Sequence, residues 1–144
     1  MANNEWSVDE LRNKAQVYCA HTEHCESEVR DKLRQWGCAE NLMDEIVAQL
    51  KRDNYINSRR YIDAFVHDKL LFQGWGRYKI QVMLRAKNEP DTLIQQALNN
   101  IDENEYIRIL RQVIQKKKGA TRDQVARFCL QRGFLWEEIL PELE

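Results

Sequence analysis

Three stretches of the sequence decide the fold: KLRQWG at residues 32–37, MLRAKN at residues 83–88 and FCLQRG at residues 128–133. In each, an apolar helical segment ends at Gly or Asn, the residues that most readily adopt the left-handed conformation of a helix cap. A second apolar segment follows each stretch, at Ile46-Val47, Leu93-Ile94 and Ile139-Leu140. The caps at Gly37, Asn88 and Gly133 lie 51 and 45 residues apart. That spacing predicts a degenerate repeat of three helices per unit.

Helix-start signals elsewhere in the chain predict the remaining helices. Ser7 with Glu10 and Thr121 with Gln124 indicate capping boxes, and three further N-caps are predicted at Ser58, Asp91 and Asp102. Apolar residues follow at helical spacing, and strict two-residue alternation is absent. We therefore predict an all-α fold of nine short helices in three tandem three-helix repeats: residues 1–53, 54–101 and 102–144. Stacked repeats predict an elongated, curved array with a long binding surface instead of a deep pocket.

Composition excludes several classes of protein. The 144 residues are 43% hydrophobic and 31% charged, which is too apolar for a disordered chain and too charged for a membrane protein. Only five Gly and two Pro occur, fewer than the turns of a β-sandwich would need. The N-terminus resembles no secretory signal, and the four Cys form no Cys-x-x-Cys pair. We expect a cytoplasmic protein with reduced thiols and no membrane partner.

The residues that could form an active site do not have the spacing of a known catalytic, metal-binding or cofactor-binding motif. Cys19, His21, His24 and Cys25 lie within seven residues, but Cys-x-His-x-x-His-Cys matches no common zinc pattern. Gly74-Trp75-Gly76 lacks the third glycine of a dinucleotide-binding loop and follows a helix instead of a strand. It predicts a tight turn between helices with Trp75 packed over it. We predict no enzyme, no metal, no cofactor and no small-molecule substrate.

Charge is unevenly distributed along a chain of net charge −1. Residues 1–53 carry seven basic and eleven acidic groups, whereas residues 54–101 carry seven basic and four acidic groups. A general polyanion-binding protein would be basic overall. The basic residues of the second and third predicted repeats have two interpretations: solvated outer helix faces, or a positive stripe that meets an acidic protein or a phosphate backbone.

Four motifs carry a resemblance to a known family. Residues 54–66, NYINSRRYIDAFV, resemble the central signature of the RecX family of regulators of the RecA recombinase. The Gly74-Trp75-Gly76 turn, residues 128–139 and residues 26–33 are similar to further elements of that family, in the same order. The resemblance covers about residues 8–143. Three positions depart from the family pattern: Cys25 in place of a Ser or Thr cap, Asn57 in place of an acidic residue, and Asn88 in place of a glycine.

The resemblance implies a regulator that lies in the groove of the RecA–single-stranded DNA filament. Such a protein would inhibit the ATPase, strand-exchange and co-protease activities of RecA, and so modulate homologous recombination, DNA repair and the SOS response. RecA is then the expected partner, with weak direct contact to single- or double-stranded DNA. The candidate partner-binding residues are Arg60, Lys69, Arg77, Lys79, Arg85, Lys87, Arg127 and Arg132. Arg60 and Arg132 could equally be structural, pairing across repeats.

An alternative function is direct DNA binding by a helical protein. Three-helix units resemble helix-turn-helix modules in size, and the basic stretch from Lys116 to Arg132 could contact phosphates. The net charge of −1 argues against DNA binding as the main activity. The sequence leaves open whether the protein caps filament ends or coats the groove, and whether it only inhibits RecA.

Overall fold

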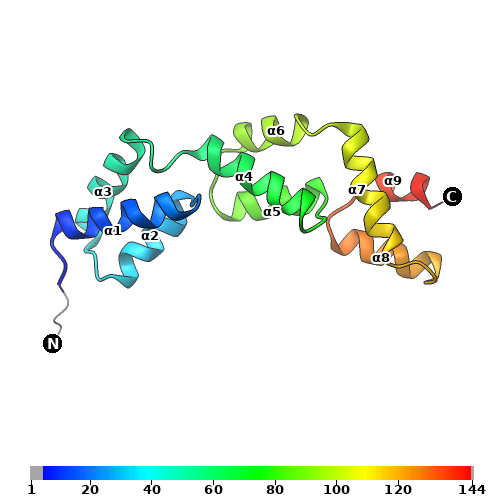
Figure 1. Cartoon of the computed structure of the whole chain (residues 1–144), viewed down its shortest axis with the longest axis horizontal. Coiled ribbons are helices and arrows are strands. Elements are labelled where there is room, and N and C mark those ends of the chain that lie inside the picture. Colours follow the sequence, from blue (N-terminus) through cyan, green and yellow to red (C-terminus); the bar gives the residue numbers. More distant parts are fainter. Residues whose placement is uncertain (1–4, 144) are drawn as a thin grey trace. The chain divides into compact units, whose positions relative to one another are not determined.

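The computed structural model describes residues 5–143, and it confirms that this part of the chain is all-α (Figure 1). The described residues form nine α-helices and a final 3₁₀ turn, with no strand. The helices are α1 (Val8–His21), α2 (Glu26–Gln35), α3 (Glu40–Arg52), α4 (Ser58–Leu71), α5 (Arg77–Ala86), α6 (Asp91–Asn99), α7 (Glu103–Gln115), α8 (Arg122–Gln131) and α9 (Trp136–Ile139). None of these helices is both long enough and apolar enough to cross a membrane.

The chain divides into two compact units, residues 1–61 and residues 62–144. In the first unit, α1, α2 and α3 pack pairwise against one another. Each helix contributes a stripe of buried side chains to one core, with members including Leu11, Ala15, Val29, Leu33, Met43, Ile46 and Leu50. This burial of one apolar face per helix stabilises helices too short to persist alone in water.

The second unit contains most of α4 and the helices α5 to α9. Here α5 packs against α6, and α8 packs against both α7 and α9. Its fully buried side chains include the aromatic pair Tyr106 and Phe134, whose ring centroids are 5.4 Å apart. Aliphatic residues from five helices are buried in the same unit: Ile80, Leu84, Ile94, Leu98, Leu110, Val113, Val125 and Ile139.

The three left-handed caps predicted from the sequence are confirmed. Gly37, Asn88 and Gly133 have φ values of 83°, 63° and 95°. In every case the N–H of the residue after the cap donates to the carbonyl five residues before it: Cys38 to Leu33, Glu89 to Leu84 and Phe134 to Cys129. The same Schellman geometry therefore ends α2, α5 and α8 and turns the chain into the helix that follows.

Three of the five predicted N-caps are also confirmed, and two are wrong by one residue. Ser7, Asp102 and Thr121 each accept a hydrogen bond from the N–H three residues later. Ser58 is instead the first residue of α4, because the carboxamide of Asn57 accepts the N–H of Arg60 at 2.9 Å. Asp91 is the first residue of α6, where its carboxylate lies at the positive end of the helix dipole and Pro90 precedes it.

Candidate functional site

Two turns of the second unit meet backbone to backbone. The N–H of Gly76 donates to the carbonyl of Arg132 at 2.7 Å, and the N–H of Tyr78 donates to the carbonyl of Gly133 at 3.2 Å. A Cβ atom on Gly76 would lie 2.6 Å from the backbone nitrogen of Phe134. The glycine at residue 76 thus allows the turn before α5 to lie directly on the end of α8.

Trp75 packs at this turn, as the sequence predicts, and holds two of the candidate lysines. The ammonium groups of Lys69 and Lys79 lie 5.0 Å and 4.3 Å from the centroid of the Trp75 ring. Lys69 also lies 5.3 Å from the centroid of Phe65. These cation–π contacts bring residues of α4 and α5 together and orient both charges toward aromatic faces.

The guanidinium of Arg132 binds inside the second unit. Its Nη1 donates to the carbonyl of Gln73 at 2.8 Å, just beyond the end of α4. The same guanidinium lies 4.6 Å from the ring centroid of Phe128. Arg132, at the end of α8, therefore provides a hydrogen-bond donor for a carbonyl just beyond the end of α4. This contact gives Arg132 a role in positioning the two helices.

Arg77 is held by four groups at the start of α5. Its guanidinium lies 4.0 Å from the ring centroid of Tyr106 and pairs with Glu103 at 2.5 Å. Its Nε donates to the carbonyl of Leu98 at 3.2 Å. The Tyr106 hydroxyl accepts a hydrogen bond from the backbone N–H of Arg77 at 3.0 Å and donates one to the carboxylate of Glu138 at 3.2 Å. Burial raises the pKa of Tyr106 well above its ordinary range, so this hydroxyl remains a donor.

Arg60 has a similar set of partners within the first unit. Its Nε pairs with Glu23 at 2.6 Å, and its Nη2 donates to the carbonyl of Asn54 at 2.9 Å. The guanidinium thereby ties the start of α4 to the segment before α2 and to the turn after α3. This is a bond network of the kind that a structural arginine makes.

The remaining candidate residues are more open to solvent. Arg85 pairs with Asp91 at 2.8 Å, but half of its side chain is exposed, and Lys87 is half-buried beside it. Arg127 is exposed on α8. It lines a cleft of about 400 Å³ with Lys117, Gln124, Phe128 and Gln131, and the Lys117 ammonium lies 4.7 Å from the Phe128 centroid. Within the second unit the structure thus joins Lys69 with Lys79 over Trp75, while Arg85 pairs with Asp91 and Arg127 lines the cleft on α8.

Sequence reasoning missed an apolar groove in the second unit, called the α4 groove below. It has a volume of about 320 Å³ and is lined by Asp63, Val66, His67, Leu70, Leu71, Ala97, Asn100, Ile101, Asp102 and Glu105. Phe72, which follows α4, is 72% exposed. The sequence does contain a signal for this surface in the three consecutive apolar residues Leu70-Leu71-Phe72. One face of a helix can bury only part of such a run, so the rest must be exposed.

The Cys and His residues near the end of α1 do not form a metal centre. In residues 5–143, no group of three or more His, Cys, Asp or Glu side chains could hold a metal ion. Cys19 and Cys25 are buried thiols. His24 stacks on Tyr18 at a centroid distance of 3.7 Å, and its Nδ1 lies 3.0 Å from the carboxylate of Glu28. These side chains therefore act as packing and pairing groups at the turn into α2.

Family models and curated sequences point to one family. The model of "RecX, first three-helix domain" matches residues 12–50, and that of "RecX, second three-helix domain" matches residues 57–98. The regulatory protein RecX of Geobacillus kaustophilus is 28% identical over 125 residues, which cover 87% of this chain and 46% of that protein. RecX of Streptococcus sanguinis is 24% identical over 133 residues, 88% of this chain and 52% of that protein. The chain spans about half the length of these curated relatives.

Solved structures of similar fold agree with the sequence matches. The crystal structure of RecX from Lactobacillus salivarius has a TM-score of 0.81 at 20% identity, covering 94% of both chains. A second crystal structure, of a regulatory protein RecX, has a TM-score of 0.76 at 17% identity and covers 96% of this chain and 78% of the other. At these identities the likeness concerns the fold.

Proposed function

This chain belongs to the RecX family, and from that premise we propose that it is a non-enzymatic regulator that binds the RecA–single-stranded DNA filament and inhibits it. The observation that carries the proposal is the match of two RecX domains, in order, across residues 12–98. The activities inhibited would be ATP hydrolysis, strand exchange and co-protease function. The protein would then act with RecA in the cytoplasm, in homologous recombination, DNA repair and the SOS response.

The proposed mechanism uses three tandem three-helix repeats, with boundaries near residues 53 and 101, in an elongated, curved array. The recurrence of one cap geometry at Gly37, Asn88 and Gly133 supports three related units. An array that follows a helical filament groove would make several weak contacts with successive protomers. Once the first contact forms, the others become intramolecular, so their free energies combine into tight binding.

The eight candidate residues fall into groups that differ in their contacts within the chain and in their exposure to solvent. Arg60, Arg77 and Arg132 have carboxylate or carbonyl partners within their own unit, which supports a role in positioning the helices. Lys69 and Lys79 lie over Trp75, and Lys69 also pairs with Asp68 at 3.5 Å. Arg85 and Arg127 are the most exposed arginines of the set, with Lys87 near Arg85. We propose Arg85, Lys87 and Arg127 as the leading partner contacts.

The test is the DNA-dependent ATP hydrolysis of RecA from the same organism, measured while this protein is added. Inhibition well below one protein per RecA protomer would support the regulator and favour blocked filament growth. Inhibition that requires near-equal amounts would support the regulator and favour coating of the groove. Unchanged hydrolysis at excess protein and low salt, with circular dichroism showing a folded chain, would overturn the proposal.

A second candidate function is direct DNA binding, and the cleft on α8 favours it. Lys117 and Arg127 supply positive charge there, Gln124 and Gln131 supply amide groups, and Phe128 supplies an aromatic face. Binding through several phosphates should weaken on the order of 10³-fold between 50 and 200 mM salt. Titration of a labelled single strand at both salt concentrations, without RecA, separates this activity from regulation of the filament.

A further inference from the structure

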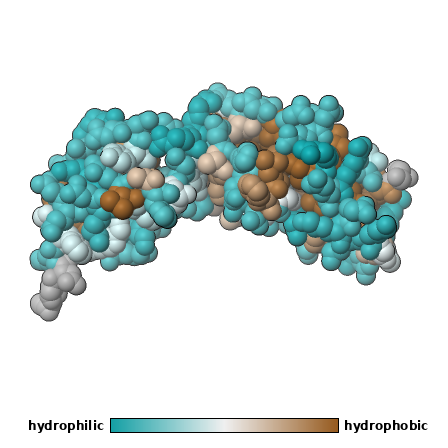
Figure 2. Space-filling view, viewed as in Figure 1, coloured by the Kyte–Doolittle hydropathy of each residue, from teal (hydrophilic) through white to brown (hydrophobic). Residues whose placement is uncertain are grey.

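The α4 groove has an apolar floor built from two sides. Val66 and Leu70 lie one turn apart on the same face of α4, and Leu71 lines the groove next to them. Ala97 and Ile101, from α6 and the connection to α7, line the same groove. Figure 2 shows a broad hydrophobic area over the C-terminal part of α4 and the α6–α7 connection. Such an area on a small protein surface is typical of a binding site.

Acidic side chains form the rim of the groove. Asp63 lies on α4, while Asp102 and Glu105 lie at the start of α7. Among the described residues that line the groove, none is Lys or Arg. Arg108 lies 3.6 Å from Glu105, and both of these side chains are exposed. The rim therefore carries a net negative charge in solvent.

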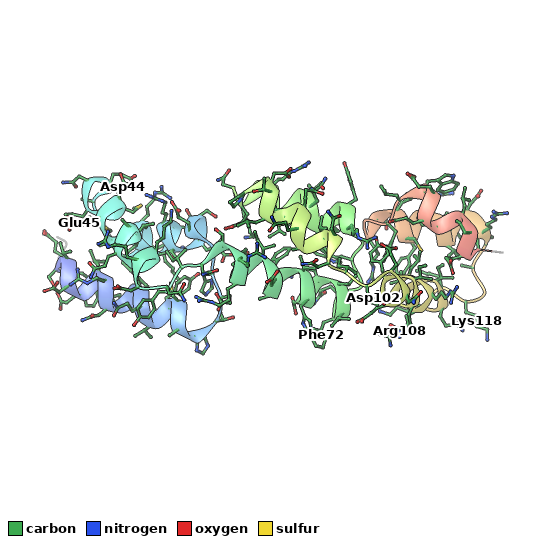
Figure 3. All side chains as sticks on the ribbon, turned by 90° about the horizontal axis from the view of Figure 1, so that it is seen from above. Asp44, Glu45, Phe72, Asp102, Arg108 and Lys118 are labelled. Carbon is green, nitrogen blue, oxygen red and sulfur yellow. The ribbon has the colours of Figure 1, made fainter. Side chains whose placement is uncertain are left out.

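Phe72 extends the apolar surface beyond the end of α4. Its ring is 72% exposed and lies 6.1 Å, centroid to centroid, from that of His67, which lines the groove. Figure 3 shows Phe72 and Arg108 projecting from the same side of the second unit. An aromatic ring left this exposed gains little from folding, whereas burial against a partner would stabilise a complex.

We infer that the α4 groove binds a segment of the partner protein that carries apolar side chains flanked by Lys or Arg. The inference rests on the proposed function, in which that partner is RecA. The apolar floor requires side chains that gain from leaving water, and the carboxylates of the rim select for positive charge beside them. A phosphate backbone would be repelled by the same carboxylates, so this surface is distinct in chemistry from the basic residues on α5 and α8.

Two variants test the groove by different chemistry. Phe72→Ala removes the exposed anchor, and Asp63→Lys reverses one charge of the rim on an exposed position of α4. Each should raise the concentration of protein that half-inhibits RecA ATP hydrolysis by on the order of tenfold. Two matched controls in the first unit are Val17→Ala, at an apolar residue that is 71% exposed, and Glu45→Lys, at an exposed carboxylate of α3. Both controls should inhibit as the wild type does.

The outcomes separate the groove from the proposed function. If the wild type inhibits RecA and both groove variants inhibit equally well, the α4 groove is not the contact surface and the regulator remains. If the wild type does not inhibit, both proposals fall. Analytical ultracentrifugation covers a third case: a dimer that Phe72→Ala abolishes would make a second copy the occupant and overturn the inference. Thermal unfolding of each variant checks folding, and Asp63→Lys carries the test should Phe72→Ala unfold early.

Discussion

The backbone N–H of Gly76 donates to the carbonyl of Arg132 at 2.7 Å, although the two residues belong to different predicted repeats. The N–H of Tyr78 also donates to the carbonyl of Gly133, so the turn before α5 and the turn after α8 are joined by two main-chain hydrogen bonds. Main-chain contact at this distance leaves no room for a side chain between the turns. The close contact between Gly76 and Gly133 thus holds these two turns of the second unit together.

Substitution of Gly76 by Ala should therefore destabilise the second unit. The added Cβ would lie 2.6 Å from the nitrogen of Phe134, and the obstructing atoms are backbone, which cannot rotate away. We expect a loss of about 2–3 kcal/mol in the free energy of unfolding, measured by urea denaturation. Gly119→Ala is the matched control: its φ is 93°, but no atom lies within 4 Å of the new Cβ, so only backbone strain of about 1–2 kcal/mol applies. A smaller loss at Gly76 than at Gly119 would contradict the close approach of the turns.

Tyr106→Phe tests the buried hydroxyl that bridges Arg77 and Glu138. The substitution keeps the ring but leaves the Arg77 N–H and the Glu138 carboxylate without this partner. We expect a cost of about 1–3 kcal/mol in the free energy of unfolding. Tyr78→Phe, at a ring that is 56% exposed, should change stability by less than about 0.5 kcal/mol. Equal effects of the two substitutions would show that the Tyr106 hydroxyl does not stabilise the fold.

The local features of the fold were predictable from the sequence because they depend on near neighbours. The left-handed caps at Gly37, Asn88 and Gly133 and the side-chain caps at Ser7 and Thr121 are set within five residues. The N-cap of α4 was placed one residue late because Asn57 and Ser58 both favour that position, and only the bond to Arg60 distinguishes them.

The candidate site was less predictable because its contacts join distant parts of the chain. The partner of Arg132 is the carbonyl of Gln73, 59 residues away, and Arg77 pairs with Glu103, 26 residues away. The sequence alone does not distinguish a basic residue that binds a partner protein from one that binds a carbonyl of its own chain. The α4 groove was missed for the same reason, since residues near 66 and 101 meet there only through packing.

Cys19 predicts a loss of stability at alkaline pH. Burial, with a smaller contribution from the Glu23 carboxylate, raises the pKa of Cys19 to about 11 from an ordinary value near 9. Between these values the unfolded chain loses the thiol proton before the folded chain does, so the free energy of unfolding falls as pH rises from about 9 to 11. The effect should reach about 2 kcal/mol. Urea denaturation at pH 8 and pH 10.5 measures it, and Cys19→Ala should lose less stability over this interval. An identical loss in the variant would rule out Cys19 as the cause.

Arg132 should prove to be a positioning residue. Arg132→Leu removes the bond to the Gln73 carbonyl and the contact with Phe128, and should lower the free energy of unfolding by about 1–2 kcal/mol. Its half-inhibitory concentration toward RecA, measured well below the unfolding temperature, should stay within about twofold of the wild type, because a shift that small is under 0.5 kcal/mol. A large loss of inhibition without a loss of stability would instead place Arg132 among the partner contacts.

Arg85 and Arg127 should behave in the opposite way. Charge reversal of both, R85E with R127E, changes exposed side chains, and the main structural loss is the ion pair of Arg85 with Asp91. Such a pair between half-exposed side chains contributes about 0.5 kcal/mol, so the thermal unfolding midpoint should fall by only a few degrees. Inhibition of RecA ATP hydrolysis should nonetheless weaken on the order of tenfold or more, because reversed charges repel the surface that the native ones attract. Inhibition that matches the wild type would remove both arginines from the partner-binding surface, and the α4 groove would then be the leading contact.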